Sequence, residues 1–231
     1  TGMNVELVDT NALVLGTSDI NGTYAVTAGG HITDDGALDV EGIATISAGT
    51  SNNVTLDQAS NDFTDDVRVT GMNVELVDAN AIILGTSDVN GTYAVTATAG
   101  GDITDDGALD IDGNSTFTAA SGRNITLDYS THTFDGTVTF AAASGNLANV
   151  TVTDSNAHIL QALNITGDLS VTAGGHITDG GVLDIDGITT ISAGTSNNVT
   201  LDNASHDFTD DVRLTGMNVE LVDTNALVLG T

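Results

Sequence analysis

The chain has 231 residues, among them no Cys, Pro, Trp or Lys, and 32 Asp and Glu against three Arg give a formal net charge of −29. Such an acidic surface repels nucleic acid and anionic membranes, which need clustered Lys and Arg, so we expect neither as a partner. The absence of Cys excludes disulfides, and no apolar run reaches the roughly 18 residues that a membrane-spanning helix needs. Val, Ile, Leu and Ala set among Thr, Asn, Asp and Gly favour strands and turns over helices.

The sequence opens on a string that recurs. Residues 1–17 read TGMNVELVDTNALVLGT, residues 215–231 repeat them without change, and residues 70–86 are a near copy. A further, degenerate unit begins near Asn146. A chain that ends in the phase in which it began is expected to be a window of a longer array.

The degenerate unit matches the first unit at a constant offset of 145 residues. GGHITD, for example, occurs at 29–34 and again at 174–179. The predicted repeat units are therefore 1–69, 70–145 and 146–214, with 215–231 restarting the first unit.

Short segments along the chain alternate apolar and polar residues at period two, the pattern of a strand with one buried face. In chain order these segments are 24–26, 31–33, 38–40, 45–46, 54–56, a stretch around Phe63, 67–69, 74–76 and 82–84. Gly, Asn and Asp occupy the joints between them, as turns require, and no stretch of useful length shows helical spacing. The sequence therefore predicts an all-β chain.

Equivalent strands recur at the length of a coil. Val26, Ile46, Val69 and Val95 mark the series, with spacings of 20, 23 and 26 residues that fill one 69-residue unit. A sandwich domain needs about 100 residues and leaves this inner repetition unexplained. A parallel β-solenoid explains both levels, because apolar residues stack inside and each coil completes the backbone ladder of the next. The absence of Pro fits, since nearly every backbone N–H is needed as a ladder donor.

We therefore predict a right-handed parallel β-solenoid (β-helix), with about three short strands per coil of 20–26 residues and three coils per 69-residue repeat. It is expected to form a single continuous segment over 1–231. One column of side-chain amides is expected to stack as a hydrogen-bonded ladder. Its members are Asn4, Asn53, Asn73, Asn124, Asn149, Asn198 and Asn218.

Several segments resemble the repeat region of giant filamentous-haemagglutinin-like adhesins. These are NVTLD at 53–57, NDFT at 61–64, VRVTG at 67–71, NVEL at 73–76 and LSVTAGGHIT at 169–178. Such adhesins are bacterial β-helix surface proteins of the two-partner-secretion type. The resemblance implies a right-handed parallel β-helix in an extracellular fibre with adhesive or matrix roles. The secretion domain of that family is not visible here, and the density of Asp is high for such repeats.

Paired aspartates recur at turns and are candidate Ca²⁺ ligands. In a solenoid, equivalent carboxylates of neighbouring coils lie about 4.8 Å apart, an unfavourable arrangement unless a cation bridges them. The competing interpretation is that Asp forms turns and keeps the rod soluble, since no EF-hand or Gly-rich nonapeptide spacing is present. No cofactor is required under either interpretation, and Ca²⁺ is an optional ligand. The candidates are Asp34, Asp35, Asp65, Asp66, Asp105, Asp106, Asp210 and Asp211.

A polysaccharide-cleaving or polysaccharide-binding β-helix protein is the main alternative. Paired carboxylates can serve as acid and base, but every candidate pair recurs with the repeat, whereas an active site is normally unique. We therefore expect no enzyme and no catalytic residue. The five histidines are expected to be polar surface residues. Ice binding ranks lower, because it needs a flat, regular Thr-x-Thr ladder and the coil lengths vary.

These observations together predict a structural segment of a long extracellular filament or adhesin, on a cell surface or in a biofilm matrix. It would act as a rigid spacer or fibre. Its expected partners are further copies of itself, head to tail or bundled laterally, and cell-surface glycans.

Overall fold

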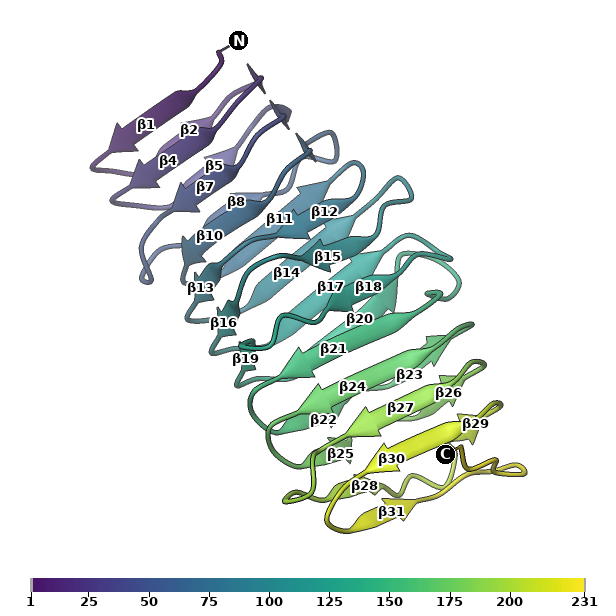
Figure 1. Ribbon diagram of the computed structural model, residues 1–231. Coiled ribbons are helices and arrows are strands. Elements are labelled where there is room, and N and C mark those ends of the chain that lie inside the picture. The colour runs from purple at the N-terminus through teal and green to yellow at the C-terminus, as the bar shows by residue number, and fades with distance from the viewer. Residues whose placement is uncertain (1, 231) are drawn as a thin grey trace.

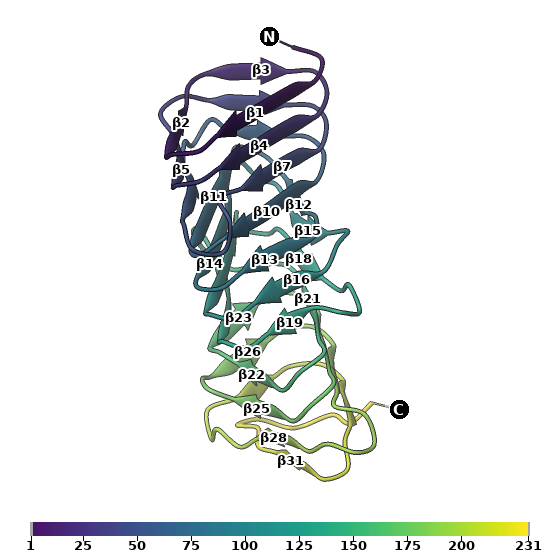
Figure 2. The same cartoon turned by 90° about the vertical axis from the view of Figure 1, so that its left-hand side faces the viewer.

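A computed structural model describes residues 2–230, and these residues form 31 short strands and no helix (Figure 1). No helix in that range is long and apolar enough to cross a membrane. The strands lie one above another in a stack, with the two ends of the chain at opposite ends of it (Figure 2). The all-β prediction is confirmed.

Ten strands belong to each repeat unit, and one more follows. The first unit contains β1 (Val5–Asp9), β2 (Leu13–Leu15), β3 (Ser18–Ile20), β4 (Tyr24–Ala28), β5 (Ile32–Asp34), β6 (Leu38–Val40), β7 (Ala44–Ser47), β8 (Val54–Leu56), β9 (Asp62–Phe63) and β10 (Val67–Gly71). The second contains β11 (Val74–Asp78), β12 (Ile82–Leu84), β13 (Ser87–Val89), β14 (Tyr93–Ala97), β15 (Ile103–Asp105), β16 (Leu109–Ile111), β17 (Ser115–Ala119), β18 (Ile125–Leu127), β19 (Thr133–Phe134) and β20 (Val138–Ala142). The third contains β21 (Val150–Asp154), β22 (His158–Leu160), β23 (Leu163–Ile165), β24 (Leu169–Ala173), β25 (Ile177–Asp179), β26 (Leu183–Ile185), β27 (Thr189–Ser192), β28 (Val199–Leu201), β29 (Asp207–Phe208) and β30 (Val212–Thr215), and β31 (Val219–Leu221) restarts the pattern.

Strands pair in parallel with the strand three places later in the chain, as β1 does with β4, β2 with β5 and β3 with β6. Three strands therefore make one turn of a parallel β-solenoid, which confirms the predicted fold class. The 11-stranded sheet runs from β2 to β31 and takes one strand from each successive turn. At about 4.8 Å per turn the stack is roughly 50 Å long.

Ten strands per unit are one more than three full turns, so each unit begins one strand position further around the solenoid. The equivalent strands β1 and β11 accordingly lie in different sheets. The predicted series of markers is wrong at this step, because Val95 pairs with Leu76 rather than with Val69. Spacings of 20, 23 and 26 residues fill the 69-residue unit with three whole coils, and period-two alternation does not reveal the extra strand.

The extra strand changes the pairing at the end of a unit. β10 pairs with both β12 and β13, through Val67 with Leu84 and Thr70 with Asp88. β20 pairs with β22 through Val138 and Leu160, at the same place in the second unit. These two strands join sheets of neighbouring units, so the units share one continuous structure.

The core is the stack of inward side chains, which alternate with outward ones along nearly every strand. In β8, for instance, Val54 and Leu56 are fully buried while Thr55 between them is not. Turn length varies from 17 residues, between Val67 and Leu84, to 25 residues, between Ile125 and Val150. The connecting loops absorb this variation, because the strands on either side remain in register.

Candidate functional site

Two of the predicted Ca²⁺ ligands are buried carboxylates that organise the following turn. Asp34 accepts hydrogen bonds from the backbone N–H of Asp57 (3.0 Å) and Gln58 (3.4 Å) and from Asn61 Nδ2 (2.7 Å). Asn61 Oδ1 in turn accepts the backbone N–H of Leu38 (2.9 Å). The oxygens of Asp34 are thus occupied by protein donors.

Asp105 has the same role in the second unit. Its Oδ1 accepts Asp128 N–H (2.9 Å) and its Oδ2 accepts Tyr129 N–H (3.1 Å). His132 Nε2 lies 2.9 Å from Asp105 Oδ2, and both side chains are inaccessible to solvent. His132 Nδ1 accepts the N–H of Leu109 (2.9 Å), so the ring holds the position that Asn61 holds in the first unit.

The third unit repeats this arrangement with Asp179, which is not among the predicted Ca²⁺ ligands. Asp179 lies 3.1 Å from His206 Nε2, and His206 Nδ1 accepts the N–H of Leu183 (3.0 Å). His158 is also buried. The prediction that all five histidines lie on the surface is therefore wrong for His132, His158 and His206, which fill interior positions, and only His31 and His176 are exposed.

The aspartate pairs before β10 and β30 each hold a following arginine. Asp66 Oδ2 lies 2.6 Å from Arg68 Nε, and Asp211 Oδ2 lies 3.5 Å from Arg213 Nη2. Asp65 and Asp210 each accept the backbone N–H of the next residue, at 2.9 and 2.8 Å. These four carboxylates form turns and ion pairs.

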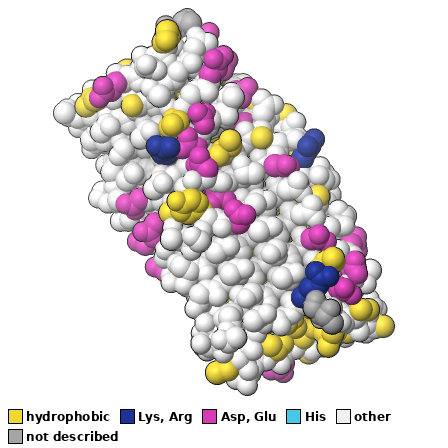
Figure 3. Space-filling model, viewed as in Figure 1, with side chains coloured by type: hydrophobic (Ala, Val, Ile, Leu, Met, Phe, Trp, Pro, Cys, Tyr) yellow, Lys and Arg dark blue, Asp and Glu magenta, His cyan; other side chains and the backbone are white. Residues whose placement is uncertain are grey.

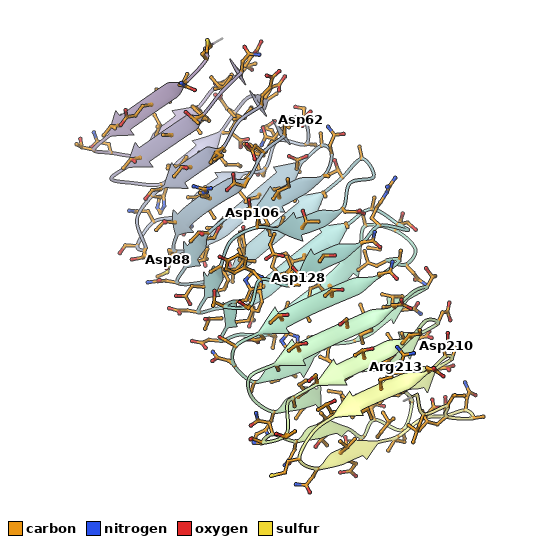
Figure 4. All side chains as sticks on the ribbon, in the orientation of Figure 1. Asp62, Asp88, Asp106, Asp128, Asp210 and Arg213 are labelled. Atoms are coloured by element: carbon orange, nitrogen blue, oxygen red, sulfur yellow. The ribbon has the colours of Figure 1, made fainter. Side chains whose placement is uncertain are left out.

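The exposed members of the predicted set are Asp35, Asp65, Asp106 and Asp210. Burial raises the pKa of Asp106, with further contributions from Asp66, Asp65 and Asp105, while Arg68 acts in the opposite direction. Asp106 lies midway along the stack and Asp210 near its C-terminal end (Figure 4). Across residues 2–230, no group of three or more His, Asp or Glu side chains is placed to hold a metal ion.

Rows of aspartates also run along the stack at positions outside the predicted turns. Asp19, Asp39 and Asp62 occupy successive rungs of the sheet β3–β6–β9. In later units Asp88 pairs with Asp110, and Asp184 with Asp207. Each of these aspartates is the central or the first residue of a short strand. Its outward position in the period-two alternation is the sequence signal that predicts such rows.

The rows place like charges close together. Partial burial first, and then the neighbouring carboxylates, raise the pKa of Asp39, Asp110 and Asp184. Amide side chains interrupt two of the rows, since Asn80 donates to Asp62 (2.9 Å) and Asn164 donates to Asp184 (2.6 Å). The carboxylates within a row therefore repel one another, but each row is short.

The predicted asparagine ladder is confirmed at three places. Asn73 donates to Asn53 (3.0 Å), Asn149 to Asn124 (2.8 Å) and Asn218 to Asn198 (2.9 Å). The first pair lines a shallow hollow of about 200 Å³ that also includes Thr55 and Glu75. A second hollow of about 580 Å³ lies at the equivalent place around Asn198 and Glu220. Each has a single carboxylate, so neither offers an acid–base pair.

Among the described residues, one part of the surface, over β21, β24 and β27, carries no charged side chain (Figure 3). In Figure 3 the acidic side chains lie at its margins, and the surface over β21, β24 and β27 is neither charged nor hydrophobic. Its outward residues are hydroxyl-bearing and stand in register on successive strands. They are Thr151, Thr153, Ser170, Thr172, Thr190 and Ser192.

The repeat itself is recognised by a family model. The model, described as repeats of unknown function (DUF5649), matches residues 2–70, 71–141 and 147–215. The chain belongs to this repeat family. The three DUF5649 matches follow the units read from the sequence to within a few residues, which supports a repeat β-helix. The comparison with curated proteins found no match, and neither did the comparison with solved structures.

Proposed function

We propose that this DUF5649 chain is a structural, non-enzymatic segment of a long extracellular filament or adhesin, where it acts as a rigid spacer. One observation carries the proposal: the 11-stranded sheet passes unbroken through all three repeat units. Separate domains are joined by exposed linkers that few contacts cross, and such joints bend. Here β10 and β20 pair across the joints, so the units resist bending as one body.

The chemistry of the surface supports the same proposal. In each pair that resembled a catalytic pair, at least one carboxylate is engaged by backbone N–H groups, an arginine or a histidine, and each pair recurs in a second unit. The resemblance to filamentous-haemagglutinin-like adhesins favours a bacterial cell surface or biofilm matrix. In such a fibre the partners are further turns of the same repeat, stacked head to tail or bundled side by side.

The proposal is tested in the cell that produces the chain. Antibodies against residues of an exposed loop, such as 128–131, should label intact cells in immunogold microscopy. The distance of the label from the envelope should increase when one more 214-residue period is inserted on its envelope-proximal side. Label that reaches its target only after permeabilisation, or at an unchanged distance, would contradict an extracellular spacer.

Binding of a neutral polysaccharide is a second candidate function, favoured by the charge-free face over β21, β24 and β27. A molecule with a net charge of −29 repels anionic glycans, whereas rows of Thr and Ser hydroxyls can hydrogen-bond to uncharged ones. Thr151→Asp and Thr172→Asp should abolish retention on an insoluble neutral glycan, with Thr27→Asp as the control. Ice binding ranks lower still, because the extra strand of each unit moves such rows to another side of the solenoid.

A further inference from the structure

Asp78 is a buried carboxylate at the joint between the first and second units. It ends β11, the first strand of the second unit, and its side chain is inaccessible to solvent. Its Oδ2 accepts the N–H of Phe63 (2.8 Å) from the preceding turn, and its Oδ1 accepts the N–H of Asn80 (2.6 Å). One carboxylate thus holds β9 to the bend that follows β11.

In the described part of the chain, the surroundings of Asp78 offer no positive charge. Ile82 follows it in β12, Ala97 is its partner in β14, and Thr98 donates to its backbone carbonyl. Among residues 2–230, the charged group that acts on Asp78 from a neighbouring strand is Asp62. Burial raises the pKa of Asp78 to about 6, Asp62 adds to this shift, and the hydrogen bonds from Phe63 and Asn80 oppose it.

The joint between the second and third units has an equivalent carboxylate, Asp154, and a histidine lies beside it. Asp154 ends β21, as Asp78 ends β11, and accepts the N–H of Asn156 (2.9 Å) and of Phe134 (3.4 Å). Four residues later, where the second unit has Ile82, the third unit has His158, and His158 Nδ1 lies 3.1 Å from Asp154 Oδ2. The chain therefore presents one joint in two versions, with and without an imidazole.

We propose that Asp78 makes the joint between the first two units sensitive to pH, so that this joint holds more firmly in mildly acidic than in neutral surroundings. His158 relieves the joint between the second and third units of the same dependence, because it gives the Asp154 carboxylate a partner. A fibre of such repeats would combine pH-sensitive and pH-tolerant joints.

The direction of this pH dependence follows from the coupling between protonation of Asp78 and opening of the joint. The folded joint binds a proton on Asp78 more tightly than the open joint does, so the stabilisation is fully present below the ordinary aspartate value of 3.8 and is lost as pH rises through about 6. With these two values, the equilibrium constant for opening the joint should be about tenfold smaller at pH 5 than at pH 7.5.

Hydrogen exchange at single amides measures this opening directly. We expect the protection of the Phe63 and Asn80 amides, corrected for intrinsic exchange, to rise about tenfold between pH 7.5 and pH 5. The equivalent amides of Phe134 and Asn156 should change much less. Because both joints lie in one molecule, the pH dependence of the exposed aspartate rows acts as a common background.

Substitutions exchange the two versions of the joint. Ile82→His should raise protection of the first joint at pH 7.5 and shrink its pH dependence, and His158→Ile should transfer that dependence to Phe134 and Asn156. Asp78→Asn should abolish the dependence. Equal protection of the first joint at both pH values, or an unchanged pH dependence in Asp78→Asn, would overturn the proposal. Should Ile82→His fail to fold, the wild-type comparison and His158→Ile still decide.

Discussion

His206 fills the place in the third unit that Asn61 fills in the first, and each side chain contacts an aspartate one turn earlier in the chain. Asn61 accepts the N–H of Leu38 and donates to Asp34, at 2.9 and 2.7 Å. His206 accepts the N–H of Leu183 and contacts Asp179, at 3.0 and 3.1 Å. Two different side chains thus satisfy the same pair of buried polar groups.

His206→Asn should therefore be tolerated, whereas His206→Leu should not. Asparagine restores the contacts seen in the first unit, so we expect the urea midpoint to stay within the equivalent of about 1 kcal/mol. Leucine leaves the Leu183 N–H unpaired inside the stack and removes one of the partners of the Asp179 carboxylate, which keeps the N–H of Asp202 (3.2 Å), at a cost of about 1–3 kcal/mol. Equilibrium unfolding followed by circular dichroism compares the two. Equal losses for both variants would show that the imidazole has a role which the amide lacks.

The interior aromatic residues of the second unit should dominate its stability. Phe117 packs edge-on against Tyr93 (5.9 Å between ring centroids) and stacks with Phe140 (6.1 Å). Phe117→Ala opens a cavity in a stack that cannot collapse sideways, so the loss should be about 3–5 kcal/mol. Tyr129→Ala, at an exposed loop, is the matched control and should cost less than about 0.5 kcal/mol. Thermal denaturation measures both, and a small loss for Phe117→Ala would mean that this region is loosely packed.

Removing one charge from an aspartate row should stabilise the protein at neutral pH. Asp110 lies among Asp88, Asp112 and Asp135, and burial and these neighbours raise its pKa. A raised pKa in the folded state means that stability is present below the ordinary value of 3.8 and is lost as pH rises above it. Asp110→Asn should therefore raise Tm by roughly 1–3 °C at pH 7 and low salt.

The gain should disappear in two conditions that remove the repulsion. At pH 3.5 the wild-type carboxyl is largely protonated, and at about 1 M salt the Debye length falls to about 3 Å. Wild type and Asp110→Asn should have equal Tm values in both. A gain that persists in high salt would point to packing instead of charge.

Calcium binding by the acidic turns is best tested at Asp106, which is exposed and lies near Asp65, Asp66 and Asp105. If these turns hold Ca²⁺, millimolar Ca²⁺ should raise Tm above the value in chelator at matched ionic strength, and Asp106→Asn should remove the difference. Asp19→Asn, at an exposed aspartate of β3 outside the candidate turns, is the control. Identical Tm values in Ca²⁺ and chelator would leave these carboxylates as turn-forming groups.

The solenoid could be predicted because period-two alternation and the 145-residue offset are both visible in the sequence. The burial of His132 and His206 could also have been found, since each stands two residues before a phenylalanine, as Asn61 stands before Phe63. Polarity alone does not indicate their interior position, because an imidazole gives no apolar signal in the period-two alternation. The pairing of β10 with β12 and β13 could not be predicted, because it depends on how loops of unequal length close around the core.

The proposal of a rigid spacer is tested most directly by measuring how the length of the molecule grows with the number of repeat periods. Solution X-ray scattering from chains with one, two and three 214-residue periods should show the maximum dimension growing by about 48 Å per period, ten turns at about 4.8 Å each. The radius of gyration of the cross-section should stay constant. A cross-section that grows with repeat number, or a length that grows as the square root of it, would contradict a rigid continuous solenoid.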